Sequence, residues 1–258
     1  TNTVRLNGHK LYLSGMSGSG AIVDGANGYQ ELEYIESTGN EYIDTKWSPL
    51  ANDRVECSVN VSSDQGTRPW PYLFGSGANF DLVLGSQAKQ FAFVHTSNNS
   101  LLYFPQTDLQ GRRVDFACQG ATATATVDGE TTTISYAGNV ALSGNQSLSF
   151  YIFQKNTPVA ANRLHANWWT AMKLYSFTII SQGNKVREFA PVKRLSDNAI
   201  GLLDRVNNVF YGNASGKGGF LAGPVKPLVG NGEVHIGVSW ADSAFETYYW
   251  DMNCSVDV

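Results

Sequence analysis

Hydrophobic and polar residues alternate along most of this chain, which is the pattern of β-strands that bury one face. The alternation is clean at 54–61 (RVECSVNV) and at 113–119 (RVDFACQ). Further short strands are predicted at the spacing of a β-sandwich, at 72–75, 80–84, 91–95, 101–104, 121–127, 131–136 and 148–153. No segment has a convincing helical period, so the pattern predicts an all-β protein.

The stretch 169–223 has the richest strand and turn signals of the chain. Its first strand is predicted to have two faces, one with Met172, Leu174 and Ser176 and the other with Lys173, Tyr175 and Phe177. Residues 181–184 (SQGN) are predicted to form a tight turn, because Gly and Asn tolerate positive φ. Pro191 should mark the exit of the next strand or a sheet edge, and Asn207–Asn208 should close a hairpin.

Two sets of motifs carry a resemblance to a known family. The first is YIESTG at 34–39 followed by YIDT at 42–45, and the second, within 175–223, contains YSF, VR, GL-D-VN and FY before a final AG. These motifs resemble those of the concanavalin A-like (laminin G-like) jelly-roll module of bacterial surface proteins and of phage tail or prophage proteins. The resemblance covers residues 29–224 and implies an antiparallel β-sandwich, but it does not name a ligand.

Short strand-like segments flank this module at 1–28 and at 225–258. The first resembles one rung of the β-helices in bacterial autotransporter passengers, and its alternation favours an ordered arm over a flexible Gly/Ser linker. The second is predicted to be a β-hairpin that packs on the sandwich, on the first arm or on another subunit, because an open apolar hairpin would aggregate. The positions predicted to mediate assembly are Val4, Leu6, Leu11, Leu13, Val234, Ile236, Val238, Trp240 and Trp250.

Composition and charge narrow the function classes. Only 16% of the residues are charged and the net charge is −4, whereas a nucleic-acid surface would need a basic stripe. No apolar run reaches the roughly 20 residues of a membrane span. The 26 glycines and the many Ser, Thr, Asn and aromatic residues are typical of extracellular β proteins. We therefore expect a module at a cell surface or on a virion, with glycans, other surface proteins or further copies of itself as partners.

Three cysteines are predicted to point to the apolar side of a strand. Cys57 shares a strand face with Val55 and Val59, Cys118 with Val114 and Phe116, and Cys254 with Trp250, Met252 and Val256. Buried free thiols are the expected state, because a free Cys packs like a small hydrophobe. A Cys57–Cys118 disulfide stays open at this point, since it requires neighbouring strands and the sequence does not determine which strands pair.

No catalytic or metal-binding pattern stands out. Glycosidases of the resembled fold class carry carboxylates spaced Glu-x-Asp-x-x-Glu, and the nearest set, Glu31, Glu33 and Glu36, belongs to the opening strand motif. Asp204 sits in a turn, where an Asx-type hydrogen bond is expected. Lectin-like sandwiches can hold calcium, but the chain has no EF-hand loop and no dense Asp cluster. We therefore expect no catalytic residue, no metal and no cofactor.

Aromatic side chains are the remaining candidates for a binding site, because sugars present apolar C–H faces on which a ring can stack. Trp168 and Trp169 lie at a loop–strand junction, and in an extended chain they must point in opposite directions. Trp70 lies in a Pro-flanked loop, and Trp47 follows a strand end. Core packing is the competing interpretation for each of them, since Trp is mostly buried.

These observations favour a non-catalytic extracellular module for adhesion or glycan binding, on a bacterial surface structure or a phage fibre. The alternative is a structural subunit of an extracellular filament or shell, assembled by β-strand pairing of the terminal arms. A glycoside hydrolase is the third hypothesis, and the missing carboxylate spacing argues against it.

Overall fold

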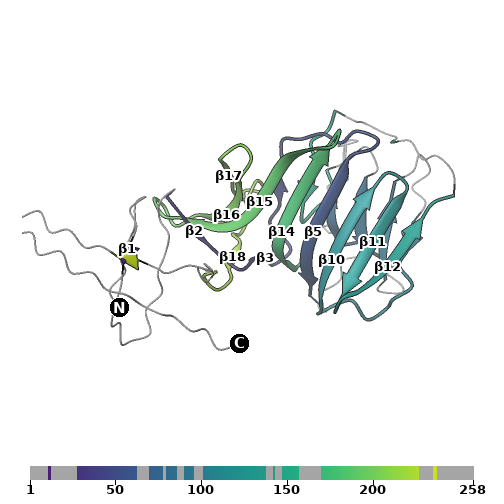
Figure 1. Ribbon diagram of the computed structural model, residues 1–258, viewed down its shortest axis with the longest axis horizontal. Coiled ribbons are helices and arrows are strands. Elements are labelled where there is room, and N and C mark those ends of the chain that lie inside the picture. Colours follow the sequence, from purple (N-terminus) through teal and green to yellow (C-terminus); the bar gives the residue numbers. More distant parts are fainter. Residues whose placement is uncertain are drawn as a thin grey trace, which may run out of the picture.

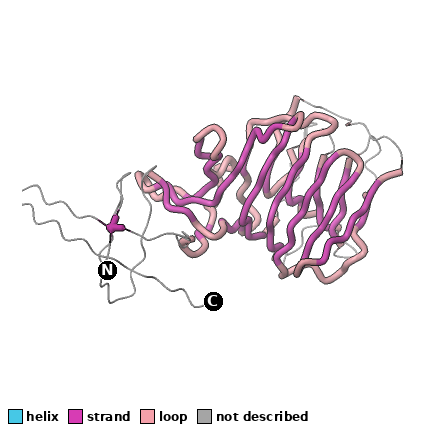
Figure 2. Tube along the Cα trace, viewed as in Figure 1, coloured by secondary structure: helices cyan, strands magenta, loops and turns pink. Residues whose placement is uncertain are grey.

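The computed structural model describes residues 11–12, 28–62, 70–77, 80–85, 90–95, 101–137, 142, 147–156, 170–226 and 235–236. These residues form strands, turns and loops and contain no helix, as the alternating pattern predicts (Figure 2). Two antiparallel sheets are stacked on one another and contain all of the described strands except one short pair (Figure 1).

The larger sheet has eleven strands. Its main path runs in the order β12 (Glu130–Ser135), β11 (Thr122–Val127), β10 (Arg113–Gln119), β5 (Arg54–Val61), β14 (Met172–Ser181), β15 (Asn184–Arg194), β16 (Ile200–Asp204) and β17 (Val209–Tyr211). Three short strands extend it: β3 (Ile35–Ser37) pairs with β14, β18 (Leu221–Ala222) pairs with β3, and β2 (Tyr29–Glu31) pairs with β15.

The smaller sheet has six strands and covers one face of the larger sheet. Its order is β4 (Ile43–Asp44), β13 (Tyr151–Ile152), β6 (Tyr72–Gly75), β7 (Asp81–Leu84), β8 (Phe91–Val94) and β9 (Leu102–Tyr103). All of its strand pairs are antiparallel. The all-β sandwich predicted from the sequence is confirmed.

Aromatic side chains fill the space between the two sheets. Phe177 of β14 meets Phe74 of β6 edge-on, with ring centroids 5.6 Å apart. Phe116 of β10 lies 5.2 Å from Phe91 of β8. All four side chains are at most 2% exposed. Because large buried rings supply much of the energy of a core, these contacts join the two sheets.

One predicted face assignment is wrong. Strict alternation puts Phe177 on the same face as Lys173 and Tyr175, but Phe177 is buried and Ser176 is exposed. The pairing of β14 with β5 shifts between Leu174 and Ser176, which marks a β-bulge. A bulge inserts one extra residue, so the alternation changes phase. Tyr175 and Ser176 therefore both lie outside the core, and Phe177 returns to it.

The local turn signals are confirmed, with one difference at a proline. Gln182 and Gly183, with φ of 51° and 79°, join β14 to β15, and Asn208, with φ of 54°, lies between β16 and β17. Pro191, however, lies inside β15 and does not end it. Pro191 lies opposite Leu202 of β16, but its carbonyl accepts from Leu32 N (2.9 Å) on the other side of the strand, between the pairings with β14 and β2. Because N–H and C=O of one residue point the same way in an antiparallel strand, the pairing with β16 does not need the missing N–H.

The YIESTG motif is stabilised by a buried carboxylate. Glu41 is 1% exposed, and its side chain accepts hydrogen bonds from Ser37 Oγ (3.0 Å) and from the backbone nitrogens of Thr38 (2.9 Å) and Asn40 (3.2 Å). Gly218 approaches the same carboxylate so closely that an added Cβ would lie 2.3 Å from Oε1. Glu41 therefore joins the turn after β3 to a loop that is distant in the sequence.

We expect Glu41→Ala to lower the free energy of unfolding by roughly 2–3 kcal/mol, because the buried Ser37 hydroxyl and two backbone nitrogens lose a charged acceptor. Urea unfolding followed by tryptophan fluorescence measures the change. Glu33→Ala, at an exposed glutamate nearby, is the control and should stay within about 0.5 kcal/mol of the parent. A Glu41→Ala loss no larger than that of the control would contradict this role for the carboxylate.

Cys57 and Cys118 are buried and free. Their strands are neighbours, since Cys57 lies opposite Phe116 and Cys118 lies opposite Val55. Burial raises the pKa of both thiols well above the ordinary value, so they stay protonated and unreactive. The prediction of packed thiols is confirmed for these two residues, and Cys254 lies outside the described residues.

The terminal segments are described only where they pair. Strands β1 (Leu11–Tyr12) and β19 (His235–Ile236) are antiparallel, with Leu11 opposite Ile236. This pairing matches one of the three arrangements predicted for the C-terminal hairpin, namely packing on the first arm. The rest of the predicted β-helix rung and the other assembly positions lie outside the described residues: Val4, Leu6, Leu13, Val234, Val238, Trp240 and Trp250.

Candidate functional site

The outer face of the larger sheet carries a continuous polar patch. Across strands β14, β5, β10 and β11, the register forms one row from Ser176, Ser58, Asp115 and Thr126. The adjacent row contains Thr178, Glu56, Ala117 and Thr124. Residues directly opposite one another in an antiparallel ladder share a face. These side chains therefore form one surface, on the side of the sheet that faces away from the core.

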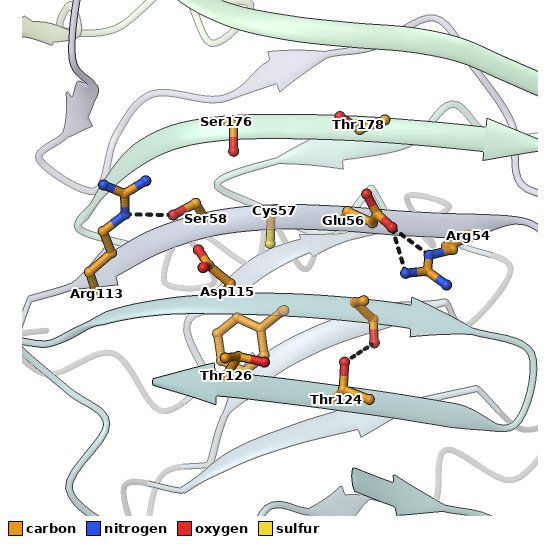
Figure 3. Close-up of a pocket in the computed structure, with 12 residues that line it drawn as sticks. Arg54, Glu56, Cys57, Ser58, Arg113, Asp115, Thr124, Thr126, Ser176 and Thr178 are labelled. Carbon is orange, nitrogen blue, oxygen red and sulfur yellow. Dashed lines mark hydrogen bonds and ion pairs between the residues drawn. The ribbon is translucent and has the colours of Figure 1, made fainter. Parts of the chain in front are cut away.

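An open depression of about 460 Å³ lies over the two rows (Figure 3). We call it the cross-strand groove, and its lining consists of these two rows, Arg54 and Arg113, together with Cys57 and Phe116, which lie between the rows on β5 and β10. The methyl side chain of Ala117 is the shortest of its row and leaves room beside Asp115. Figure 3 shows Ser176 on the strand at one end of the groove and Thr126 at the other.

Arginine side chains flank the groove in the direction of the strands. Arg113 donates from Nε to Ser58 Oγ (2.8 Å), and its guanidinium carbon lies 4.3 Å from the centroid of the Tyr175 ring. On the opposite side, Arg54 contacts Oε1 of Glu56 through Nε and Nη2, both at 2.6 Å. These contacts position the two guanidinium groups on either side of the floor of the groove.

The β-bulge in β14 brings two neighbouring residues to this surface. Ser176 lines the groove, and Tyr175 supports Arg113 from the side. Tyr34 meets Tyr175 edge-on at 5.3 Å, and Lys173 Nζ lies 4.6 Å from the centroid of Tyr34. Each cation–π contact contributes about 0.5–1 kcal/mol at an exposed site. The alternating rings and cations therefore stabilise the wall that contains Arg113.

Asp115 places an unpaired carboxylate on the floor of the groove. Its side chain is exposed, and no ion pair or hydrogen bond joins it to another described residue. Glu56, in contrast, is paired with Arg54. A carboxylate can accept about four hydrogen bonds, and the hydroxyl groups of Ser176 and Thr178 can donate or accept. The groove is thus chemically suited to a ligand rich in hydroxyl groups.

Of the four predicted aromatic candidates, the two that the structure describes, Trp47 and Trp70, do not line this groove. Trp47 is half-buried, and its ring meets Phe150 of the core edge-on at 5.4 Å. Trp70 is also half-buried and packs against a small apolar cluster of β7 and β8. Trp168 and Trp169 lie outside the described residues. A role of these four residues in binding stays a prediction.

Sequence reasoning missed the residues of the groove. The alternation in β5, β10 and β14 reveals which positions face outward, but a polar outward face is also the ordinary solvent side of a sandwich. Arg113 and Asp115 belong to no motif. In the sequence, charged residues do occur close to outward-facing Ser and Thr positions of these strands. Only the pairing of the strands brings them together on one surface.

The sequence predicts no metal site, a structural role for Asp204 and no membrane span. Among the described residues, no three His, Cys, Asp or Glu side chains are grouped in a way that could hold a metal ion. Asp204 is fully buried and accepts a hydrogen bond from Val206 N at 3.0 Å, which is the Asx-type turn expected from the sequence. No helix in the described part of the chain has the length and hydrophobicity that a membrane crossing requires.

No protein-family model matches the sequence, and no curated protein matches it. Solved structures do match. The crystal structure of a Bacteroides ovatus protein, for which carbohydrate binding has been suggested, superposes with a TM-score of 0.50 at 13% identity, over 76% of this chain and 60% of that one. The fold is a concanavalin A-like β-sandwich. This chain spans 60% of the length of the Bacteroides protein.

Two further structures resemble the concanavalin A-like sandwich at lower scores. A heptameric SAP-like pentraxin from Limulus polyphemus has a TM-score of 0.38 at 12% identity, over 58% of this chain and 74% of that one. Domains LG4-5 of the mouse laminin alpha1 chain have a TM-score of 0.37 at 13% identity, over 75% of this chain and 50% of that one. At such identities the likeness concerns the fold alone.

Proposed function

We propose that this sandwich is a non-catalytic module that binds carbohydrate outside the cell, for adhesion or glycan recognition. The supporting observation is the cross-strand groove, in which Asp115 offers free acceptor oxygens between the guanidinium groups of Arg54 and Arg113. Adjacent sugar hydroxyls can donate to both oxygens of a carboxylate or accept from two nitrogens of a guanidinium. The suggested carbohydrate binding of the Bacteroides protein agrees with this proposal.

Hydrolysis is the competing activity on this face, because the groove contains two carboxylates. Glycosidases need two, one as general acid and the other as nucleophile or base. Here Glu56 is tied to Arg54 by two contacts to one oxygen, so Asp115 is the single unpaired carboxylate among the described residues that line the groove. This arrangement favours binding. Release of reducing sugar that disappears in both Glu56→Gln and Asp115→Asn would overturn it.

A structural subunit of a filament or shell is the second hypothesis, in which the terminal arms pair with other subunits. Leu11–Tyr12 pairs with His235–Ile236 of the same chain, so these strands have a partner without a second subunit. Light scattering of the protein with and without residues 1–27 and 227–258 tests this hypothesis. Polymers that disappear when the arms are removed would favour it, and a monomer in both cases would exclude it.

We expect Asp115→Asn to weaken the binding of a glycan selected on an array by roughly 10- to 100-fold, because lost hydrogen bonds to a charged group cost about 1.5–3 kcal/mol. Calorimetric titration measures the dissociation constant. Asp197→Asn, at an exposed aspartate between β15 and β16, is the matched control and should bind like the parent. Unchanged affinity in Asp115→Asn would place the ligand elsewhere, and Trp168→Ala and Trp169→Ala would then test the two tryptophans that the sequence singled out.

A further inference from the structure

We infer, on the basis of the carbohydrate binding proposed above, that the cross-strand groove holds an internal stretch of a neutral polysaccharide whose chain runs across the strands. A site for a chain end would be closed on at least one side along the path of the chain. Among the described residues, no side chain closes either end of the cross-strand groove, long side chains line its other two sides, and its charges are balanced.

Short side chains stand at both ends of the groove. At the β14 end these are Ser176 and Thr178, and at the β11 end Thr126 lies opposite Thr131 of the exposed edge strand β12. Glu188 of β15, opposite Thr178, is ion-paired with a lysine of its own strand. None of these side chains closes the groove, so a sugar chain can continue past either end.

Long side chains stand on the other two sides. Arg113, backed by Tyr175, forms one wall, and Arg54 with Glu56 forms the other. Figure 3 shows the two arginines at opposite sides of the groove along the strand direction. Both are positioned by hydrogen bonds, Arg113 to Ser58 and Arg54 to Glu56. A ligand is therefore blocked along the strands, and the free direction lies across them.

The row across the strands is longer than one sugar ring. The path from β14 to β11 spans three strand spacings, or roughly 14 Å, and β12 adds about 5 Å more. A pyranose ring is about as wide as one strand spacing. Polar positions recur at each step, at Ser176, Ser58, Asp115, Thr126 and Thr131. Consecutive rings of a chain can therefore meet consecutive polar side chains.

The charges of the groove balance one another. Arg54 is paired with Glu56, and Arg113 stands on the same strand as the free Asp115. A carboxylate on the floor repels uronate or sulfate groups and accepts hydrogen bonds from sugar hydroxyls. The net charge of the whole chain, −4, adds to the repulsion of anionic glycans. A neutral, hydroxyl-rich polysaccharide fits this surface better than an acidic one.

Affinity electrophoresis of the full chain tests the ligand class, in gels that contain neutral arabinoxylan, mannan, β-glucan or starch, or anionic pectate or alginate. Retardation by a neutral polysaccharide is expected, and retardation by the anionic ones alone would overturn the inference. Calorimetry with oligosaccharides of the retarding polysaccharide should then give a dissociation constant about tenfold lower for the tetrasaccharide than for the monosaccharide. Equal affinity for the monosaccharide would indicate a single-sugar site instead.

Plug variants test whether the chain passes through both ends. Thr126→Trp and Ser176→Trp each place an indole at one end, and each should weaken binding of the retarding polysaccharide by about tenfold. Thr122→Trp, on the same strand as Thr126 but outside the lining of the groove, is the matched control. Circular dichroism confirms folding of each variant. A loss at one end alone would indicate a chain-end site, and unchanged affinity at both ends would place the chain elsewhere.

Different results would refute carbohydrate binding and refute the internal stretch of polysaccharide. Absence of binding to every polysaccharide and to every glycan of the array would refute the carbohydrate function itself. Binding that depends on Asp115, but is equal for the monosaccharide and the tetrasaccharide, would leave that function in place and refute only the internal stretch.

Discussion

Replacing Asp81 with alanine is expected to lower the free energy of unfolding by about 3–5 kcal/mol, because it leaves a buried lysine without its carboxylate partner. Asp81 is fully buried, and its Oδ2 forms an ion pair with Lys155 Nζ, whose side chain is 9% exposed. Its Oδ1 accepts a hydrogen bond from Ser76 N at 3.0 Å. Gly75 accommodates this group, since an added Cβ there would lie 2.2 Å from Oδ1.

The double variant Asp81→Ala/Lys155→Met is the control, because it removes both charges together. We expect it to recover most of the loss, since a buried ion pair replaced by apolar groups is often neutral in stability. Urea unfolding gives both values. A single Asp81→Ala variant that loses less than about 1 kcal/mol, or a double variant no better than the single one, would show that the pair is not the source of the effect.

The same pair should produce a pH dependence. Burial raises the pKa of Asp81 to about 6, against the lowering effect of Lys155, from an ordinary value of 3.8. Between these two values the folded state binds more protons than the unfolded state, so this group makes the free energy of unfolding fall as the pH rises from about 4 to 6. Comparison with Asp81→Asn, which cannot titrate there, isolates this contribution.

Replacing Phe177 with alanine is expected to cost about 3–5 kcal/mol of unfolding free energy, because it removes a ring from the centre of the core. Phe177 is 1% exposed and bridges the two sheets. Its ring centroid lies 5.6 Å from that of Phe74, 6.1 Å from that of Phe150 and 6.3 Å from that of Phe189. The surrounding rings cannot close the resulting cavity without giving up their own contacts.

Tyr175→Ala, two positions earlier, is the matched control for Phe177→Ala. The bulge keeps Tyr175 outside the core, so its loss should cost about 1 kcal/mol through the contacts with Arg113 and Tyr34. Thermal unfolding by calorimetry compares the two variants. Equal losses, or a larger loss for Tyr175→Ala, would contradict the change of face at the bulge.

The sequence by itself determined the strands and most of the turns of this protein. Alternation predicts β5 and β10 at their observed bounds, because a half-buried strand requires a period of two. The turns at Gly183 and Asn208 follow from residues that tolerate positive φ, whereas the positive φ of Gln182 has no such signal in the sequence. These signals are local, so they can be read without knowing which segments lie side by side.

The motifs at 34–45 and within 175–223 predicted the fold of the sandwich. They did not predict the contacts that stabilise these segments. YIESTG was recognisable as a pattern, whereas the contact between Glu41 and the loop at Gly218 depends on how distant segments approach. The sequence also placed Cys57 and Cys118 on apolar faces, and strand pairing made them neighbours. The Asp81–Lys155 ion pair has no sequence signal, because its members lie on separate segments.

Only the tertiary structure decided the candidate site. The groove exists because β14, β5, β10 and β11 pair in one register, which brings Ser176, Ser58 and Asp115 into a row. The bulge that turns Ser176 outward and Phe177 inward breaks the period on which sequence reasoning depends. Pairing and bulges are set by the total burial and hydrogen bonding of many strands together, whereas the sequence pattern records the preference of each strand alone.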